Sequence, residues 1–367
     1  MGGTEIDYVK DAFAKNWIAP LGENVNKFEE AVKEYTGVKN ALALSSGTAA
    51  IHLALIEAGV GEGDIVFCSS LTFSASANPI IYQHATPVFI DSEMDTWNMS
   101  PIALEKAFKK YEKLNQLPKA VVVVNLYGQS AKMNEILKIC KKYNAIVIED
   151  AAESLGSTYY GEQSGTFGDL GVYSFNGNKI ITTSGGGMLV SRNKEKTDNA
   201  LFLATQARDE ALHYEHSTIG YNYRLSNISA GIGRGQMKVL DQHIKKRRKI
   251  FQDYYEALNH FDGFEFQPRL EGFKPNRWLT ALTIDKEKVH VSITDLVNHL
   301  AENNIEARPV WKPMHLQPIF KKYDYIKEQE DNSKWLFDNG ICLPSGSNLS
   351  LEEQEFVINK IKEFVLK

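Results

Sequence analysis

Short, almost wholly apolar runs alternate with helix-like segments between residues 41 and 192. Strands buried on both faces read as continuous apolar runs, whereas amphipathic helices repeat every three to four residues. The alternation therefore predicts βα units around a mostly parallel sheet, which is an α/β fold. The predicted strands are 65–69, 87–91, 120–126, 145–150, 171–174 and 188–191.

Two of the intervening segments carry clear helix signals. Ser100 is a typical N-cap residue, and Pro101 suits the first helical position because its missing N–H would be unpaired there anyway. Further along, Met133, Ile136 and Cys140 recur at helical spacing. We expect these three side chains to face the sheet.

The pattern changes after residue 238. Longer amphipathic stretches predict helices at 237–258, 293–303 and 351–366, and two shorter runs predict strands at 279–284 and 305–307. We therefore predict a large α/β domain over residues 1–238 and a smaller α+β domain over residues 239–367.

The composition is that of a globular protein. Of the 367 residues, 43% are hydrophobic and 24% are charged, which excludes disordered and collagen-like chains. The net charge of −5 gives no excess of positive charge to hold a nucleic acid. The basic run 245–249 lies inside a helical pattern and is interpreted as a solvated or interface face.

The cysteines and the hydropathy indicate the compartment. Cys68, Cys140 and Cys342 are odd in number and widely spaced, which argues against disulfides and zinc and favours a reducing cytoplasm. No uncharged apolar stretch reaches the roughly 20 residues of a membrane span. The first ten residues also lack the apolar core of a signal peptide, so we expect a cytoplasmic protein without membrane contact.

The first candidate binding motif is the start of a helix. Ser46, Gly47 and Thr48 precede an apolar helical stretch, and small residues at a helix N-terminus leave backbone N–H groups open to a phosphate. Taken alone, such a motif is more often an ordinary helix cap than a phosphate site. It lacks the GxxxxGK[ST] and GxGxxG patterns of ATP and dinucleotide sites, so a compact monophosphate is the better ligand.

Two further residues point to the same edge of the sheet. Asp150 ends a buried strand, where open α/β sheets bind ligands. Lys179 lies on the turn between two predicted strands, before the glycines of 185–187. A loop lysine can simply be solvated. Together, however, a phosphate cradle, a carboxylate and an amine are the groups that pyridoxal 5′-phosphate (PLP) requires.

From about Asn16 to the C-terminus the chain resembles the DegT-type nucleotide-sugar aminotransferases. The shared stretches are SSGTAAIHLAL, LTFSASANPI, PVFIDSEMDTWN, NLYGQSAKM, IEDAAESLGS, YSFNGNKIITTSGGGM, GYNYRLSN, NRWLT, ARPVWKPMH and CLPSG. The resemblance implies fold type I of the PLP-dependent transferases, with a mostly parallel sheet in the large domain and a smaller α+β C-terminal domain.

The resemblance also implies roles for individual residues. Lys179 matches the lysine that forms a Schiff base with PLP and later moves the proton between cofactor and substrate carbons. Asp150 matches the partner of the ring nitrogen, and Glu153 matches a residue beside the ring hydroxyl, of the type found in enzymes that aminate carbon 4. Phe73 matches the aromatic residue stacked on the ring, although core packing is an equal alternative.

The phosphate site implied by the resemblance involves two subunits. Gly47, Thr48 and Ser174 would hold the phosphate from one subunit, and Asn222 would reach it from the partner. The site then needs a homodimer. Arg224, in the same loop as Asn222, would contact a substrate phosphate or brace the interface.

Two other segments resemble the sugar-nucleotide pocket of the family, although packing of the loops is an alternative for each. Their candidate substrate-binding residues are Asn16, Ile18, Ala19, Trp311, Lys312 and His315. The segment 213–216 (HYEH) suggests a metal, but it has no third ligand at a sensible spacing, and we expect no metal site.

The implied reaction moves an amino group from L-glutamate to C4 of a nucleotide-linked 4-keto-6-deoxy sugar, for lipopolysaccharide or another glycan. The stretches NWIAPLG, HYEH and NRWL are most similar to enzymes that make UDP-N-acetylbacillosamine, which favours UDP-2-acetamido-2,6-dideoxy-4-ketoglucose as acceptor. The stretches EDAAE and NGNK occur also in GDP-perosamine synthases, so GDP-4-keto-6-deoxymannose is the alternative. A sugar dehydratase and a non-catalytic binding module are further alternatives, which the presence of Lys179 disfavours.

Overall fold

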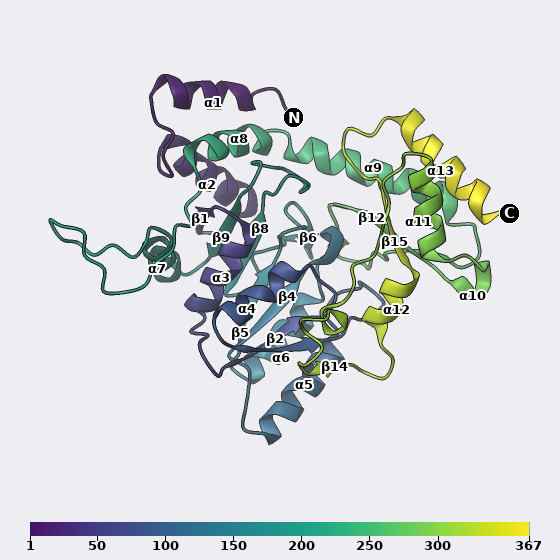
Figure 1. The fold of residues 1–367 in the computed structure, drawn as a ribbon, viewed down its shortest axis with the longest axis horizontal. Coiled ribbons are helices and arrows are strands. Elements are labelled where there is room, and N and C mark those ends of the chain that lie inside the picture. Colours follow the sequence, from purple (N-terminus) through teal and green to yellow (C-terminus); the bar gives the residue numbers. More distant parts are fainter. Residues whose placement is uncertain (367) are drawn as a thin grey trace.

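The computed structural model describes residues 1–366 (Figure 1). The helices are α1 Glu5–Ala14, α2 Glu23–Thr36, α3 Gly47–Glu57, α4 Asn78–Tyr82, α5 Pro101–Lys113, α6 Met133–Lys142, α7 Lys194–Ala204, α8 Asn227–Met237, α9 Leu240–Leu258, α10 Lys286–Val289, α11 Ile293–Glu302, α12 Asn332–Asn339 and α13 Leu351–Val365. The strands are β1 Asn40–Leu44, β2 Ile65–Ser69, β3 Thr86–Ile90, β4 Ala120–Val124, β5 Ile146–Asp150, β6 Thr158–Tyr159, β7 Glu162–Gln163, β8 Leu170–Ser174, β9 Gly187–Ser191, β10 Phe264–Phe266, β11 Phe273–Lys274, β12 Thr280–Ile284, β13 Arg308–Pro309, β14 Tyr325–Ile326 and β15 Gly340–Leu343.

The central sheet has eight strands in the order β1-β9-β8-β5-β4-β2-β3-β14. All neighbours are parallel except β9, which runs antiparallel to both β1 and β8. Side chains alternate between two cores: Val66 and Cys68 pack with the α3 side, whereas Phe67 packs with Phe108 of α5. The predicted α/β fold with a mainly parallel sheet is confirmed. Helices cover both faces of the sheet, as is usual for parallel sheets.

Helix signals within this part of the chain behave as predicted. The hydroxyl of Ser100 accepts the N–H of Ala103, with Pro101 at the first helical position of α5. Met133, Ile136 and Cys140 of α6 are buried against the sheet. The strand predicted at 120–126 ends early, at Val124, because the chain turns into a short 3-10 segment there.

Helix α8 was not predicted, because its glycines hide the helical pattern. A Cβ at Gly233 would lie 2.7 Å from the ring of Phe28, and one at Gly235 would lie 2.8 Å from the Cα of Glu5. The glycines therefore let α8 pack closely against α1 and α2. The helix predicted from residue 237 accordingly begins at Leu240, as α9.

A second sheet, in the order β10-β12-β15-β13, packs with α9, α11 and α13. The strand predicted at 305–307 is wrong. The N–H of Ile305 donates to the carbonyl of Leu300 and so ends α11, and the edge strand is β13, at Arg308–Pro309. The β-branched Ile305 closes a helix here instead of entering a strand ladder.

The division at residue 238 stays a prediction. From the second part, β14 pairs with β3 of the central sheet, and β11 pairs with β6. Figure 1 shows α9 running from the α8 side of the molecule toward α13.

The basic run of α9 is partly a packing element. Lys245 and Lys249 are exposed, as predicted, but Arg247 is buried and donates to the carbonyl of Trp278.

No helix within residues 1–366 has the length and apolar character needed to cross a membrane.

Candidate active site

A cavity of about 340 Å³ opens at the carboxyl ends of β5 and β8, and the N-terminus of α3 also reaches it. This is the edge where open α/β sheets bind ligands. Many of its lining residues are among the predicted cofactor residues. They are Gly47, Thr48, Phe73, Asp150, Glu153, Ser174 and Lys179, joined by Trp311 from the predicted substrate set.

The start of α3 is shaped for a small anion. Ser46 caps the helix by accepting the N–H of Ala49, and Gly47 comes next. A Cβ at Gly47 would lie 3.1 Å from the Cβ of Ser174, and one at Gly187 would lie 2.3 Å from the carbonyl carbon of Ser46. These small residues bring the helix N-terminus and the end of β8 together, where backbone N–H groups and hydroxyls attract a phosphate.

Asp150 is a buried carboxylate at the end of β5. Its Oδ2 accepts the hydroxyl of Ser76 at 2.6 Å, and its Oδ1 accepts the N–H of Ala152 at 3.1 Å. Burial raises the pKa of Asp150, while the bonds from Ser76 and Ala152 and the charge of Lys179 oppose this rise. A cationic partner inside the cavity would favour its ionised form.

Lys179 and Glu153 face one another across the cavity. The amine Nζ of Lys179 lies 3.6 Å from Oε1 of Glu153, while Oε2 of Glu153 accepts the N–H of Tyr127 at 2.6 Å. Burial raises the pKa of Glu153 to about 7, although the amine of Lys179 and the N–H of Tyr127 favour the charged form. A carboxyl group with a pKa near neutrality can exchange a proton at working pH.

Aromatic rings enclose the amine. Nζ of Lys179 lies 4.0 Å from the ring centre of Trp278, within the range of a cation–π interaction. The indole N–H of Trp278 donates to the carbonyl of Asn178 at 2.8 Å and so ties the lysine turn to the second sheet. Phe73, 58% exposed, and Trp311 form another pair, with ring centres 5.6 Å apart.

The cavity is also lined by three residues for which no role was predicted from the sequence: Thr72, Ser76 and Trp278. Trp278 lies in NRWLT and Ser76 in LTFSASANPI, so the motifs contained them. Nothing in the sequence showed that a tryptophan 99 positions after the lysine would contact it. The hydroxyls of Thr72 and Ser76 are hydrogen-bonded at 2.7 Å, which extends the chain of polar contacts from Asp150.

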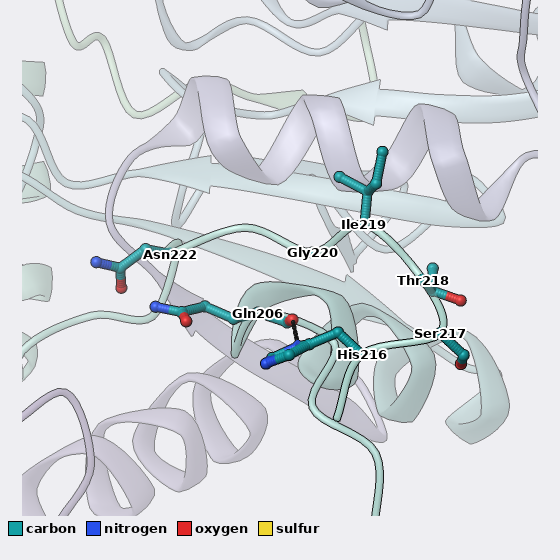
Figure 2. Close-up of a pocket in the computed structure, with 7 residues that line it drawn as sticks. All are labelled: Gln206, His216, Ser217, Thr218, Ile219, Gly220 and Asn222. Carbon is teal, nitrogen blue, oxygen red and sulfur yellow. Dashed lines mark hydrogen bonds between the residues drawn. The ribbon is translucent and has the colours of Figure 1, made fainter. Parts of the chain in front are cut away.

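Several predicted site residues lie outside this cavity in the single chain. Asn222 lines a separate hollow of about 540 Å³, together with Gln206 and Gly220 (Figure 2). Arg224 donates to Glu29 at 2.7 Å and to the carbonyl of Ala43 at 2.9 Å, so it braces β1 and α2 of its own chain.

His315 is held in a polar network. Its Nδ1 lies 2.7 Å from the hydroxyl of Ser70, its Nε2 lies 3.3 Å from Asp331, and its ring stacks on Tyr325 at 3.6 Å. The remaining substrate candidates, which do not line the cavity, occupy exposed positions: Asn16, Ile18, Ala19 and Lys312.

Within the segment 213–216, one histidine contacts one carboxylate. His213 lies 2.7 Å from Glu215 on the surface. Across the residues that the structure describes, no group of three or more His, Cys, Asp or Glu side chains could hold a metal ion.

Comparison with known proteins identifies the family. Residues 1–362 match the DegT/DnrJ/EryC1/StrS aminotransferase family. The chain belongs to this family. It is 58% identical to the "Putative pyridoxal phosphate-dependent aminotransferase EpsN" of Bacillus subtilis (strain 168), over 98% of this chain and 92% of that protein. It is also 38% identical to a GDP-perosamine synthase of Escherichia coli O157:H7, over 99% of this chain and 96% of that protein.

The solved structures agree. A DegT DnrJ EryC1 StrS aminotransferase from Brucella abortus superposes with a TM-score of 0.91 at 29% identity, covering 99% of this chain and 96% of that one. The chain is thus a DegT-family sugar aminotransferase, and its cofactor is PLP.

The cavity of this aminotransferase fits the cofactor. Gly47 at the start of α3 and Gly187 at the start of β9 leave room that a Cβ would fill, and the buried carboxylate of Asp150 has an oxygen to offer to a protonated ring nitrogen. The amine of Lys179 lies in the same cavity, with its side chain 11% exposed. An anion cradle, a buried carboxylate and a sheltered amine match the phosphate, ring nitrogen and aldehyde of PLP.

Proposed function

We propose that this enzyme transfers an amino group from L-glutamate to C4 of a nucleotide-linked 4-keto-6-deoxy sugar. The acceptor we favour is UDP-2-acetamido-2,6-dideoxy-4-ketoglucose. The observation that carries the proposal is the pairing of Lys179 with Glu153 in the cavity that Asp150 also lines. Glu153 is the residue type that resembles the carbon-4 subgroup, and its carboxyl group lies beside the amine.

When bound, PLP supplies an aldehyde that condenses with amines and a ring that accepts an electron pair. Lys179 would hold the cofactor through its amine. With the donor bound, Nζ of Lys179 would take the proton from the donor carbon and return it in the second half of the reaction. Asp150, oriented by the hydroxyl of Ser76, would keep the ring nitrogen protonated.

Glu153 sets the charge around the amine. With a pKa raised to about 7 by burial, its carboxyl group is close to half ionised at neutral pH. The ionised form attracts the side chain of Lys179, whereas the protonated form does not, so the charge of Glu153 changes the setting in which Nζ would act. The exchange of donor and acceptor on the same site implies ping-pong kinetics.

The phosphate is assigned to Gly47, Thr48 and Ser174 from one subunit and Asn222 from its partner, which makes the enzyme a homodimer with shared sites. Two observations support this. Asn222 lies outside the cavity of its own chain. The loop after α7 extends away from the body of the molecule and carries exposed Leu212, Tyr214 and Ile219 (Figure 1). Exposed apolar side chains gathered on one loop favour burial against a partner.

We assign a contact with the sugar-nucleotide to Trp311, which lines the cavity beside Phe73. The exposed candidates Asn16, Ile18, Ala19 and Lys312 stay proposed substrate contacts in the assembled enzyme. His315 already contacts Ser70 and Asp331, and Arg224 already donates a hydrogen bond to Glu29. The role we propose for both residues is therefore to position the neighbouring loops.

A second acceptor is favoured by a separate observation. The 38% identity to a GDP-perosamine synthase extends over 99% of this chain. GDP-4-keto-6-deoxymannose is therefore the alternative acceptor, with the same amination at C4.

Mass spectrometry of the sugar products tests the proposal. The enzyme is incubated with PLP, L-glutamate and either UDP-2-acetamido-2,6-dideoxy-4-ketoglucose or GDP-4-keto-6-deoxymannose, and a Lys179→Ala variant serves as control. Amination of the UDP sugar alone supports the favoured acceptor, and amination of the GDP sugar alone supports the alternative. A sugar product that has lost oxygen without gaining nitrogen would make the protein a dehydratase. The absence of any reaction with either sugar would contradict the proposal.

A further inference from the structure

A second cleft of about 860 Å³ lies between α9 and the segment that links β10 to β12. It shares no lining residue with the PLP cavity. Consecutive residues line the two hollows, because Trp278 lines the cavity whereas Arg277 lines the cleft. The volume suits a small organic molecule.

The lining of the cleft is strongly cationic. Arg248, Arg269, Lys274 and Arg277 line it together with a carboxylate, Glu265. Within residues 1–366, none of these five side chains takes part in an ion pair. Cations gathered in one cleft without bound carboxylates repel one another, and an anion would relieve that repulsion.

Arg277 is the most deeply buried of these cations. It is 5% exposed, its φ is +56°, and its Nη1 donates to the carbonyl of Gln267 at 3.0 Å. Burial, with the charges of Arg269 and Arg248, lowers the pKa of Arg277 to about 9. A left-handed backbone at a residue other than glycine is strained, and such strain gathers at functional sites.

Arg248 is likewise fixed in place. Its Nε donates to the carbonyl of Pro275 at 2.8 Å and its Nη2 to that of Lys274 at 3.2 Å. These bonds hold the guanidinium against the segment that carries Arg277. Arg269 makes no hydrogen bond within the described residues and extends from an exposed position. The cleft thus combines two anchored guanidinium groups with one that is free to close on a ligand.

The other wall is aromatic. Phe251 and Tyr255 stack with ring centres 6.2 Å apart, and both meet Phe266 edge-on. The guanidinium of Arg277 already lies 3.7 Å from the ring centre of Phe251, whereas Tyr255 is 38% exposed. Tyr255 therefore offers a flat surface on which a planar group can stack.

We propose that this cleft binds a nucleoside diphosphate, at a site separate from the one that holds the cofactor and the sugar. The guanidinium groups would take the two phosphates, for which their fork geometry is suited. The base would stack on Tyr255, and the carboxylate of Glu265 would accept a hydrogen bond from a ribose hydroxyl. Inorganic phosphate would use the cations but not the aromatic wall.

Hydrogen–deuterium exchange of the holoenzyme locates the site. UDP, pyrophosphate and uridine are the probes. We expect UDP to slow exchange in peptides that cover 248–259 and 265–277, with pyrophosphate and uridine giving weaker protection at equal concentration. Protection confined to peptides of the PLP cavity would overturn the proposal. Equal protection by pyrophosphate would show that no nucleoside is recognised, which also overturns it.

A matched pair of variants tests the contacts. Arg269→Ala removes an exposed guanidinium of the cleft, and Arg192→Ala removes an exposed arginine after β9, outside the cleft. The UDP concentration that half-protects peptides 265–277 should rise at least about tenfold in Arg269→Ala and stay unchanged in Arg192→Ala. Equal midpoints in the two variants would overturn the assignment.

Discussion

The amine of Lys179 lies 3.6 Å from the carboxylate of Glu153, although 26 positions separate them in the chain. The two residues come from different turns at the carboxyl edge of the central sheet, after β5 and after β8. Their charges are coupled, because the amine favours the ionised form of a carboxyl group that burial otherwise keeps protonated. The pH response of the enzyme should therefore follow this pair.

Replacing Lys179 with alanine should abolish amino transfer and preserve folding. Nζ of Lys179 contacts the carboxylate of Glu153 and the ring of Trp278, both of which lie inside the cavity. Its loss would remove both the proposed attachment of the cofactor and the proposed proton carrier. We expect kcat to fall by at least about 10²–10⁴-fold. Steady-state kinetics and circular dichroism measure the two effects, and amino transfer at the wild-type rate would contradict the assignment.

Glu153→Gln should change how stability depends on pH. In the folded protein the pKa of Glu153 is raised from 4.5 to about 7, so its contribution to folding is complete below pH 4.5 and is lost as the pH rises through about 7. The loss amounts to about 3 kcal/mol of unfolding free energy in protein freed of cofactor. Glutamine does not titrate, so urea unfolding from pH 5 to 8 should give a flatter profile for the variant. Parallel profiles would show that Glu153 does not titrate in this range.

Trp278→Phe should loosen the lysine turn while keeping a ring beside the amine. The variant loses the hydrogen bond from the indole to the carbonyl of Asn178, worth about 1 kcal/mol of unfolding free energy. If Trp278 positions Lys179, the pH profile of kcat should shift as well. The matched control is Trp335→Phe, a partly exposed tryptophan of α12 that does not line the cavity. A change in stability without any shift of the pH profile would make Trp278 purely structural.

Gly187→Ala should weaken the binding of PLP. Its Cβ would meet the carbonyl carbon of Ser46 at 2.3 Å, and backbone atoms there cannot move without displacing the start of α3. Fluorescence titration with PLP should show at least about tenfold weaker binding. Gly61→Ala, where a Cβ meets nothing within 4 Å, is the control. Equal affinity in both variants would contradict a phosphate cradle at this position.

Mixing two inactive variants should restore activity if the sites are shared. Lys179→Ala lacks the amine, and Asn222→Ala lacks the proposed contact to the partner's phosphate. In a mixed dimer the chain with Asn222→Ala keeps its own Lys179 and receives Asn222 from the other subunit. Random exchange of subunits should therefore return about a quarter of the wild-type sites. Recovery of no activity after verified exchange would place Asn222 within its own subunit's site.

The sequence determined much of the sheet and the chemistry at its edge. Nearly continuous apolar runs identified β2, β5 and β8, because strands buried on both faces have few polar positions, and those lie toward the ends of the strands here. Asp150 at a strand end and Gly47 at a helix start were visible for the same local reason: each lies where one element stops and the next begins.

Tertiary structure decided which distant side chains meet. Helix α8 was hidden because its glycines serve close packing against α1 and α2, which no local periodicity records. Trp278 reaches Lys179 only because the second sheet places β12 beside the lysine turn. The raised pKa of Glu153 likewise follows from burial. Local pattern is fixed by neighbours along the chain, whereas burial and long-range contacts depend on how the elements pack.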